Sequence, residues 1–376
     1  MRRILHISND DKYISLGKRI FDQVPAVENT YWIIPGTNHT IQNVSFAHEN
    51  LALKNLNSSY YHDQINSYDL ICIHFLNLEV YPVLRSKKIT TPILWIGWGG
   101  DYYWLIDTCP DFNLLLPHTR KWVHHIFLGN KLTSFVKKLK KIKRSPKLQA
   151  VNQISYFAPI YSAEFQSIKK TYPNFKPQFL EWNYGYIDQD IIAYYTPLRR
   201  YGDAVMIGNS ATPTNNHLEI FEDLSHVLQE AEIILPLNYG DTSYKKHISK
   251  VAKEKFGDRA MILNDFISTK DFDKELLKCR NLIIGSNRQQ AVGTIITALY
   301  LGLNVFLYKN SFNYDFFKTM GFYVYSIEDL IAQPQLLQSQ LQDEQILENR
   351  KKINQCWSIE KNVNSITNLL QSIANL

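Results

Sequence analysis

The sequence predicts an α/β protein made of two Rossmann-like, doubly wound domains. Short apolar runs of strand length alternate with stretches of helical length, and the alternation begins afresh near residue 204. The chain has 376 residues, a length that favours two domains over one. Hydrophobic residues make up 45% of the chain, which is enough to build two sizeable cores.

In the first half, four apolar runs are expected to be strands of a parallel sheet: Arg3–Ser8, Thr30–Ile34, Asp69–His74 and Pro92–Gly97. The last two are nearly all apolar, as expected of strands buried on both faces. A helix is predicted around Tyr13–Gln23, and residues 112–150 are expected to be helical and very basic. The stretches Ile154–Phe157 and Gln178–Trp182 follow. The Tyr-rich segment that comes next predicts a domain boundary at 186–200, with a first domain at 1–190 and a second domain at 191–376.

The second half repeats the alternation. Its predicted strands are Ala204–Ile207, Glu232–Leu235, Ala260–Leu263, Asn281–Ile284 and Asn304–Tyr308. The predicted helices between them are His217–Gln229, Tyr244–Phe256, Thr269–Cys279 and Ala291–Leu301. Helical segments at about 327–342 and 344–375 end the chain, and the last helix is expected to cross back to the first domain.

Composition excludes several classes of protein. Lys and Arg number 41 against 35 Asp and Glu, a surplus of 6 that is small for a dedicated nucleic-acid binder and suits anionic ligands or an anionic membrane. The four cysteines are far apart, which argues against a zinc ribbon or a disulfide framework. The apolar stretch at the N-terminus is too short for a signal peptide, and no apolar run reaches about 18 residues. The expected location is therefore the cytoplasm.

Common catalytic motifs are also missing. No GxGxxG follows the first strand, and no P-loop, HExxH or GxSxG is present. The sequence therefore predicts neither a nicotinamide dehydrogenase nor a metal-dependent hydrolase, and no metal or other cofactor is expected.

Ligands of open parallel sheets bind at the carboxyl ends of the strands. Gly208, Asn209 and Ser210 follow the strand at 204–207. The glycine would let the backbone approach a phosphate closely, and the amide and hydroxyl side chains that follow could bind it. The alternative is a helix cap made by Thr214 or Asn215.

The most specific local signal follows the strand at 281–284. Arg288, together with the amides that open the next helix, suits a pyrophosphate. Gln289, Gln290, Gly293 and Thr294 complete this candidate site. The alternative is an exposed loop with ordinary capping.

Two weaker candidates could contact a base or a sugar. Tyr239 follows the strand at 232–235 and could stack on a base or sugar, or it could be a plain surface tyrosine. The loop around Phe266 could hold the base through backbone groups.

In the first half, Asp101 follows a Gly-rich strand end and is the first choice for a catalytic base. The alternative is that Asp101 caps the next helix. His74 also ends a buried strand and could face the same cleft, although a structural role is common for such a histidine. His6 and Asp10 are weaker candidates still.

One stretch is strongly basic. Between residues 137 and 147 lie seven cations and no acid, with Trp122 and other apolar residues upstream. This pattern indicates a surface that meets anionic lipid, through Lys137, Lys138, Lys140, Lys141, Lys143 and Arg144. The alternative is a merely solvated basic helix.

These motifs together resemble the TDP-N-acetylfucosamine:lipid II N-acetylfucosaminyltransferases, which serve the assembly of enterobacterial common antigen. The specific matches lie in the second half: Ile207–Ser210 with Asn215–His217, Ile233–Pro236 with Tyr239-Gly240, and Arg288-Gln289-Gln290 with Gly293-Thr294. His74, Trp98-Gly99 and Asp101 are weaker matches. Ala291 stands where the family is expected to have glycine.

The resemblance implies a GT-B glycosyltransferase with two Rossmann-like domains and a cleft between them. It also implies a TDP-sugar donor, a polyprenyl-diphosphate-linked acceptor and peripheral attachment to the inner face of the cytoplasmic membrane. Three alternatives stay open: a sugar-nucleotide epimerase of the same fold, a transferase with another donor or a non-lipid acceptor, and a non-catalytic two-lobed binding protein.

Overall fold

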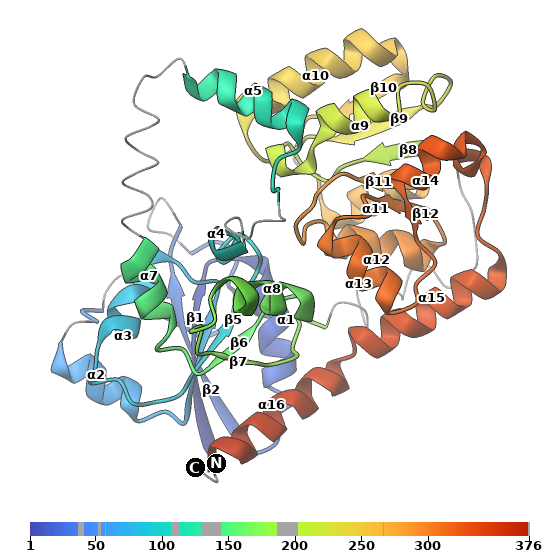
Figure 1. The fold of residues 1–376 in the computed structure, drawn as a ribbon. Helices are drawn as coiled ribbons and strands as arrows, with labels where there is room; N and C mark the ends of the chain where they lie inside the picture. The colour runs from blue at the N-terminus through green and yellow to red at the C-terminus, as the bar shows by residue number, and fades with distance from the viewer. Residues whose placement is uncertain are drawn as a thin grey trace. The chain divides into compact units, whose positions relative to one another are not determined.

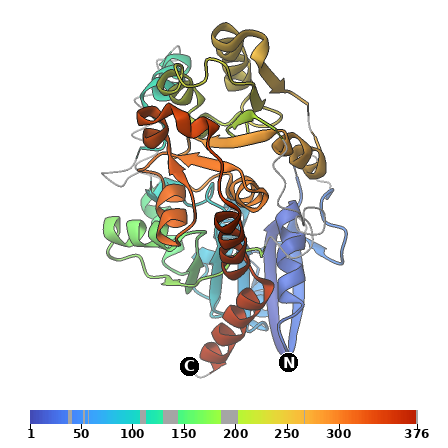
Figure 2. The same ribbon diagram turned by 90° about the vertical axis from the view of Figure 1, so that its right-hand side faces the viewer.

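The computed structural model describes residues 1–36, 41–51, 54–56, 58–106, 113–128, 144–185, 202–265 and 267–374. The chain divides into two compact units. Unit 1 comprises Met1–Pro110, Ser134–Asp188 and Cys356–Leu376, and unit 2 comprises Asp111–Thr133 and Gln189–Gln355. Each unit holds one parallel sheet flanked by helices, which confirms the predicted α/β class with two Rossmann-like domains (Figures 1 and 2).

Unit 1 is built on a seven-stranded sheet of order β3-β2-β1-β4-β5-β6-β7. Its strands are β1 (Arg2–Asn9), β2 (Val27–Ile34), β3 (Glu49–Asn50), β4 (Leu70–His74), β5 (Ile93–Ile96), β6 (Tyr156–Ala158) and β7 (Gln178–Phe179). Its helices are α1 (Lys12–Phe21), α2 (Ser59–Asn66), α3 (Tyr81–Arg85), α4 (Tyr103–Ile106), α7 (Arg144–Val151), α8 (Ser162–Thr171) and α16 (Ile359–Ala374). Every residue of β4 and β5 is buried, as expected for strands covered on both faces.

Unit 2 is built on a six-stranded sheet of order β10-β9-β8-β11-β12-β13. Its strands are β8 (Ala204–Ile207), β9 (Ile233–Pro236), β10 (Ala260–Leu263), β11 (Cys279–Ile284), β12 (Asn304–Leu307) and β13 (Tyr325–Ser326). Its helices are α5 (Pro117–Leu128), α9 (His217–Asp223), α10 (Thr242–Phe256), α11 (Thr269–Leu277), α12 (Val292–Leu301), α13 (Phe312–Thr319), α14 (Ile327–Ala332) and α15 (Asp343–Cys356).

Both sheets reverse their strand order once. In unit 1 the reversal lies between β1 and β4, which pair in parallel, and in unit 2 it lies between β8 and β11. Loops that leave the carboxyl ends of such a strand pair diverge to opposite faces of the sheet, so the backbone opens there and ligands bind there. The topology therefore predicts that ligands bind near the loops after β1, β4, β8 and β11.

The predicted strands of the second half lie within one residue of the observed ones at most ends, except that β11 begins two residues early. The predicted boundary at 186–200 lies outside the described residues. The helical segment expected at 344–375 is interrupted after Cys356, where α15 ends, and α16 starts at Ile359. Along the described ranges, no helix combines the length and apolar character needed to cross a bilayer.

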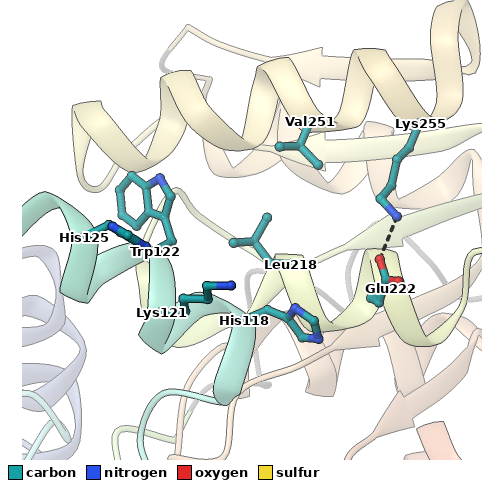
Figure 3. Close-up of a pocket in the computed structure, with 8 residues that line it drawn as sticks. All are labelled: His118, Lys121, Trp122, His125, Leu218, Glu222, Val251 and Lys255. Carbon is teal, nitrogen blue, oxygen red and sulfur yellow. Dashed lines mark hydrogen bonds and ion pairs between the residues drawn. The ribbon is translucent and has the colours of Figure 1, made fainter.

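One segment of the predicted first domain belongs to unit 2 instead. Helix α5 packs against α9 and α10, and Figure 3 shows these three helices together. The backbone N–H and the hydroxyl of Thr119 donate to the two carboxylate oxygens of buried Glu219 over 2.9 and 2.6 Å. The Trp122 ring lies beside Tyr244, with ring centroids 5.2 Å apart. These contacts join residues 100 or more positions apart, so the local sequence could not show them.

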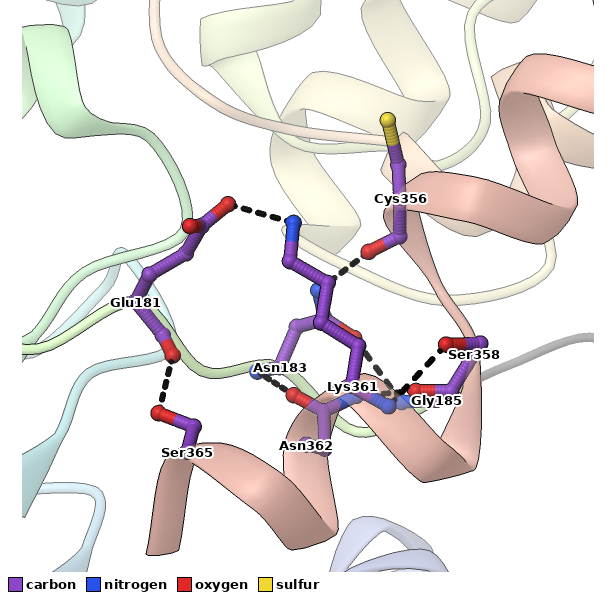
Figure 4. Close-up of polar contacts among 8 residues, drawn as sticks. All are labelled: Glu181, Asn183, Gly185, Cys356, Ser358, Lys361, Asn362 and Ser365. Atoms are coloured by element: carbon purple, nitrogen blue, oxygen red, sulfur yellow. Dashed lines mark hydrogen bonds and ion pairs between the residues drawn. The ribbon is translucent and has the colours of Figure 1, made fainter. Parts of the chain in front are cut away.

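Helix α16 returns to unit 1 and packs against α1, where Ile366, Leu369 and Leu370 join the core that contains Ile20 and Phe21. A polar cluster fixes the start of this helix (Figure 4). The side chain of Asn362 is 1% exposed, accepts from the backbone N–H of Asn183 and donates to the Asn183 side chain and to the Ser358 carbonyl.

Replacing this buried amide should destabilise unit 1. Asn362→Ala removes three hydrogen bonds and leaves the Asn183 groups without these partners, so we expect a loss of about 2–3 kcal/mol. Urea unfolding followed by tryptophan fluorescence measures it. The matched control is Asn364→Ala, at an exposed position of the same helix, which should change stability by less than about 0.5 kcal/mol. Equal effects of the two substitutions would contradict this account of α16.

Candidate active site

Three loops of unit 2 bring polar side chains together at the carboxyl edge of its sheet. The loop after β8 carries Asn209, and the loop after β9 carries Tyr239. The amide nitrogen of Asn209 donates to the Tyr239 hydroxyl over 2.9 Å. Main-chain bonds reinforce this contact, because the Ala211 N–H donates to the Tyr239 carbonyl over 2.7 Å. The tyrosine ring is 53% exposed while its hydroxyl is held, so one face is presented to solvent.

Gln290, in the loop after β11, connects these groups to Arg288. Its amide nitrogen donates to the Asn209 side-chain oxygen over 3.1 Å. Its own side-chain oxygen accepts from Nε of Arg288 over 2.9 Å and from the Thr214 hydroxyl over 2.5 Å. The Gln290 backbone carbonyl accepts from Asn313 of α13 over 3.0 Å. Gln290 is only 8% exposed, so the residue that connects this network is itself held in the interior of the fold.

Gly208 is required by its backbone and by its neighbour. Its φ is +73°, in the region that favours glycine. A Cβ at this position would lie 2.4 Å from Nε2 of His217, so no larger residue fits without displacing that ring. The next residues are fixed as well, because the amide nitrogen of Asn215 donates to the Ser210 carbonyl over 2.9 Å. The loop after β8 is thus a tight, preformed turn.

The start of α12, like that of α9, has no side-chain cap, whereas four other helices of unit 2 have one. Asp241, Ser268, Ser311 and Ser326 cap α10, α11, α13 and α14 through their side chains. The residue before α12 is Ala291, which has no oxygen to cap with and has a φ of +61°. The first-turn amides of α12, which include those of Gly293 and Thr294, are therefore left for another acceptor.

The structure describes the remaining predicted residues unevenly. Gln289, Gly293 and Thr294 are half-buried beside the network. Phe266 lies outside the described residues, and so do Lys137, Lys138, Lys140, Lys141 and Lys143. Arg144 is the first residue of α7. Within the described ranges, no group of three or more His, Cys, Asp or Glu side chains is arranged to hold a metal ion.

Asp101 does not have the surroundings of a catalytic base. It is 5% exposed, and one carboxylate oxygen accepts from the Trp95 indole over 2.7 Å and from the Leu76 N–H over 2.9 Å. The other oxygen accepts from the Trp98 N–H over 2.9 Å. Burial raises the pKa of this carboxyl, and these hydrogen bonds oppose the rise. The prediction of a base is therefore not supported, since Asp101 holds the loop after β5 instead.

His74 lies inside a directional chain of hydrogen bonds. The Asn29 amide nitrogen donates to Asp22 over 3.2 Å, so its oxygen faces Nε2 of His6, 3.1 Å away. His6 must then donate from Nε2 and accept at Nδ1, which is 3.0 Å from Nε2 of His74.

The same reasoning continues outward from the pair. His74 donates from Nε2, and its Nδ1 accepts from the Tyr184 hydroxyl over 2.8 Å. That hydroxyl accepts from the Trp98 indole over 2.5 Å. Both histidines are fully buried and neutral, because burial lowers the pKa of His6 to about 4 and that of His74 well below its usual value. His74 therefore positions Trp98 through Tyr184, and the prediction that it acts on a substrate is not supported.

Sequence reasoning missed other contributors. Asn313 is fully buried in α13 and holds the Gln290 carbonyl, and its only signal was a polar residue in an aromatic helix. The Asn113 carbonyl accepts from the side chain of Asn287, and the Leu116 N–H donates to Asn216. The segment leading into α5 thus holds two of the three loops, a role with no local sequence signal.

Residues 187–357 match the sequence model of a family described as 4-alpha-L-fucosyltransferase glycosyl transferase group 56. The fold of the whole chain is similar to that of sucrose-phosphate synthase from Thermosynechococcus elongatus, with a TM-score of 0.64, 9% identity and coverage of 100% of both chains. This protein is a glycosyltransferase of the GT-B fold. The family predicted from the sequence motifs is confirmed for the matched segment, which contains the three polar loops.

Two further solved structures share the fold of this glycosyltransferase. HepE from Anabaena, in complex with UDP and glucose, has a TM-score of 0.64 and 12% identity, with coverage of 99% of this chain and 100% of that one. The lipopolysaccharide outer core galactosyltransferase WaaB, in its apo form, has a TM-score of 0.60 and 10% identity, with coverage of 98% and 99%. At these identities the likeness concerns the fold alone. No curated protein matches the sequence significantly.

The buried histidine chain makes the stability of unit 1 depend on pH. In the unfolded chain His6 titrates near 6.5, and in the folded glycosyltransferase near 4. Between these values the unfolded state binds more protons, so stability is present above about pH 6.5 and falls as the pH drops toward 4. We expect unit 1 to lose about 2 kcal/mol between pH 7 and pH 5 through His6 alone.

Urea unfolding at the two pH values tests this, with two variants. His6→Gln should lower stability at pH 7 and make the difference between pH 7 and pH 5 smaller. His48→Gln, at an exposed position of the same unit, should keep the wild-type difference. An unchanged pH dependence in His6→Gln would show that the buried pair is not its source.

Proposed function

We propose that this glycosyltransferase moves a deoxyamino sugar, similar to N-acetylfucosamine, from a TDP-sugar to a polyprenyl-diphosphate-linked saccharide. The match of residues 187–357 to a fucosyltransferase family supports a donor of the deoxyhexose class. The observation that carries the proposal is the fixed placement of Arg288 beside the uncapped start of α12.

The donor diphosphate would be held by these two features. Gln290 orients the guanidinium of Arg288 through a neutral amide, so this contact cancels none of its charge. The first-turn amides of α12 add the positive end of the helix dipole. Both sources of positive potential are in place before the sugar leaves, so they stabilise the departing diphosphate without rearrangement. We propose that they do so in place of a metal ion.

Tyr239 would bind the nucleoside part of the donor. Asn209 holds its hydroxyl, and the half-exposed ring offers a face for stacking on a base or a sugar. The fold relative HepE was solved with UDP, a nucleoside diphosphate of the class proposed here.

The acceptor saccharide would meet unit 1 at an aromatic cluster. Tyr13 packs edge-on against Trp98 with ring centroids 5.3 Å apart, and Phe75 lies 5.4 Å from the same indole. The chain from His74 through Tyr184 fixes that indole. Aromatic faces at the end of a parallel sheet suit the apolar face of a sugar ring. Phe75 has a φ of +68°, and such strain in a bulky residue occurs mainly at functional positions.

Substitution of Arg288 tests the donor site. Wild-type protein should melt at a higher temperature in millimolar dTDP, because ligand binding to the folded state stabilises it. Arg288→Ala should bind dTDP at least about tenfold more weakly, since a charge-assisted hydrogen bond contributes about 1.5–3 kcal/mol. Arg280→Ala, at the opposite end of β11, is the matched control and should keep the wild-type shift. No shift of the wild type with dTDP, UDP or GDP would overturn the proposal.

Peripheral attachment to the inner face of the cytoplasmic membrane is part of the same proposal. Replacing Lys137, Lys138, Lys140 and Lys141 with Gln should weaken binding to vesicles of phosphatidylglycerol and phosphatidylcholine, because each cation near an anionic surface contributes about 1 kcal/mol. Cosedimentation measures the bound fraction, and dTDP binding should stay unchanged. Equal vesicle binding before and after the replacement would remove this part of the proposal.

A further inference from the structure

A cavity of about 400 Å³ lies in unit 2 between α5, α9 and α10, and none of the three polar loops lines it. Figure 3 shows its lining, to which each of the three helices contributes. His118, Lys121, Trp122 and His125 come from α5, Leu218 and Glu222 from α9, and Val251 and Lys255 from α10. No residue of the candidate active site lines it, so it calls for its own explanation.

The lysines and the glutamate that line this cavity leave one net positive charge, on Lys121. Lys255 donates to the Glu222 carboxylate over 2.8 Å, and this pair is balanced. Lys121 has no carboxylate within ion-pair distance in the described part of the chain, and its side chain is exposed. His118 and His125, from the same helix, add imidazole N–H groups that can donate to an anion. The potential at the rim therefore favours an anion.

The walls are apolar beneath these charges. The Trp122 ring is stacked on His247 with centroids 5.1 Å apart and meets Tyr244 edge-on, so its position is fixed. Leu218 and Val251 are half-buried on the facing helices. An apolar wall under a cationic rim suits a ligand with an anionic head and an apolar body. A small inorganic anion would leave the apolar wall unused.

We infer that this cavity binds the phosphate headgroup of an anionic phospholipid at the membrane surface. Its volume would hold a phosphoglycerol group together with the first carbons of an acyl chain, which would lie against Trp122, Leu218 and Val251, while the rest of the chains would stay in the bilayer. Two observations favour a lipid over a soluble phosphate. Ile126 on α5 is 48% exposed and so available to the bilayer interface. The sequence that follows α5 carries the seven cations between residues 137 and 147, which would meet the same surface.

This inference rests on the membrane part of the proposed function and is independent of the donor site. It adds a specific headgroup site to the general electrostatic attraction that the basic stretch would supply. Binding to anionic vesicles should therefore depend more on which residues line the cavity than on the total charge of the protein. This dependence distinguishes a headgroup site from general attraction.

The experiment compares two variants of the full chain with equal background charge. Lys121→Gln combined with His125→Gln alters the cavity, and Lys246→Gln removes an exposed lysine of α10 that does not line it. Cosedimentation with equimolar phosphatidylglycerol and phosphatidylcholine vesicles should show at least about fivefold weaker binding for the cavity variant. The Lys246 variant should bind like the wild type, and neither should bind phosphatidylcholine alone.

The dTDP melting shift of each variant reports folding and donor binding, and it should match the wild type in both. A cavity variant that binds anionic vesicles as well as the Lys246 variant does would overturn the inference, even if the basic stretch proves necessary. Stabilisation of the wild type by soluble glycerol 1-phosphate, with vesicle binding unaffected by the cavity substitutions, would assign the cavity to a soluble anion and overturn it too.

Discussion

The amide of Gln290 is the constraint on which the proposed donor site depends. One side chain joins the loop after β8 through Asn209 and orients Arg288 within its own loop, while the Gln290 backbone is held by Asn313. An amide can do this because it donates and accepts at once without adding charge. A carboxylate at this position would accept from Arg288 equally well, but it would cancel the guanidinium charge and repel a diphosphate. A neutral hub thus positions a cation without placing a negative charge beside it.

The two units share a topology, but the residues at the point where the strand order reverses differ in character. In unit 2 the strand ends at the reversal point lead into polar loops that a ligand can reach. In unit 1 the equivalent strands β1 and β4 contribute His6 and His74, whose ring nitrogens are hydrogen-bonded to each other and to other side chains of the unit. What unit 1 presents there is aromatic, with Trp98 fixed by the buried chain. The division suits a charged donor on one unit and a less charged saccharide on the other.

Sequence reasoning identified the elements that depend on local signals. The strands β8 and β9 are short, wholly apolar runs, and their period and length suffice to predict them. The loops after β8 and β11 were found because glycine and clustered polar residues follow such runs. The roles of Asp101 and His74 depended instead on distant partners, since Tyr184 lies 110 residues from His74. The placement of α5 likewise depends on Glu219, and nothing in either segment alone encodes that pairing.

Residues with a strained backbone lie in the same loops, at the carboxyl ends of the strands, as the polar and aromatic side chains of the candidate site. In the described part of the chain, four residues other than glycine have a left-handed backbone, and Phe75, Asn216 and Ala291 follow the carboxyl ends of β4, β8 and β11. For alanine this conformation costs about 1 kcal/mol more than for glycine, the residue that the family resemblance leads one to expect there. The strain is tolerated because the surrounding network fixes the loop, with Gln290 bonded on both its side chain and its carbonyl. The turn at Ala291 in return leaves the α12 amides uncapped, so the conformation that costs stability is the one that an anionic ligand would use.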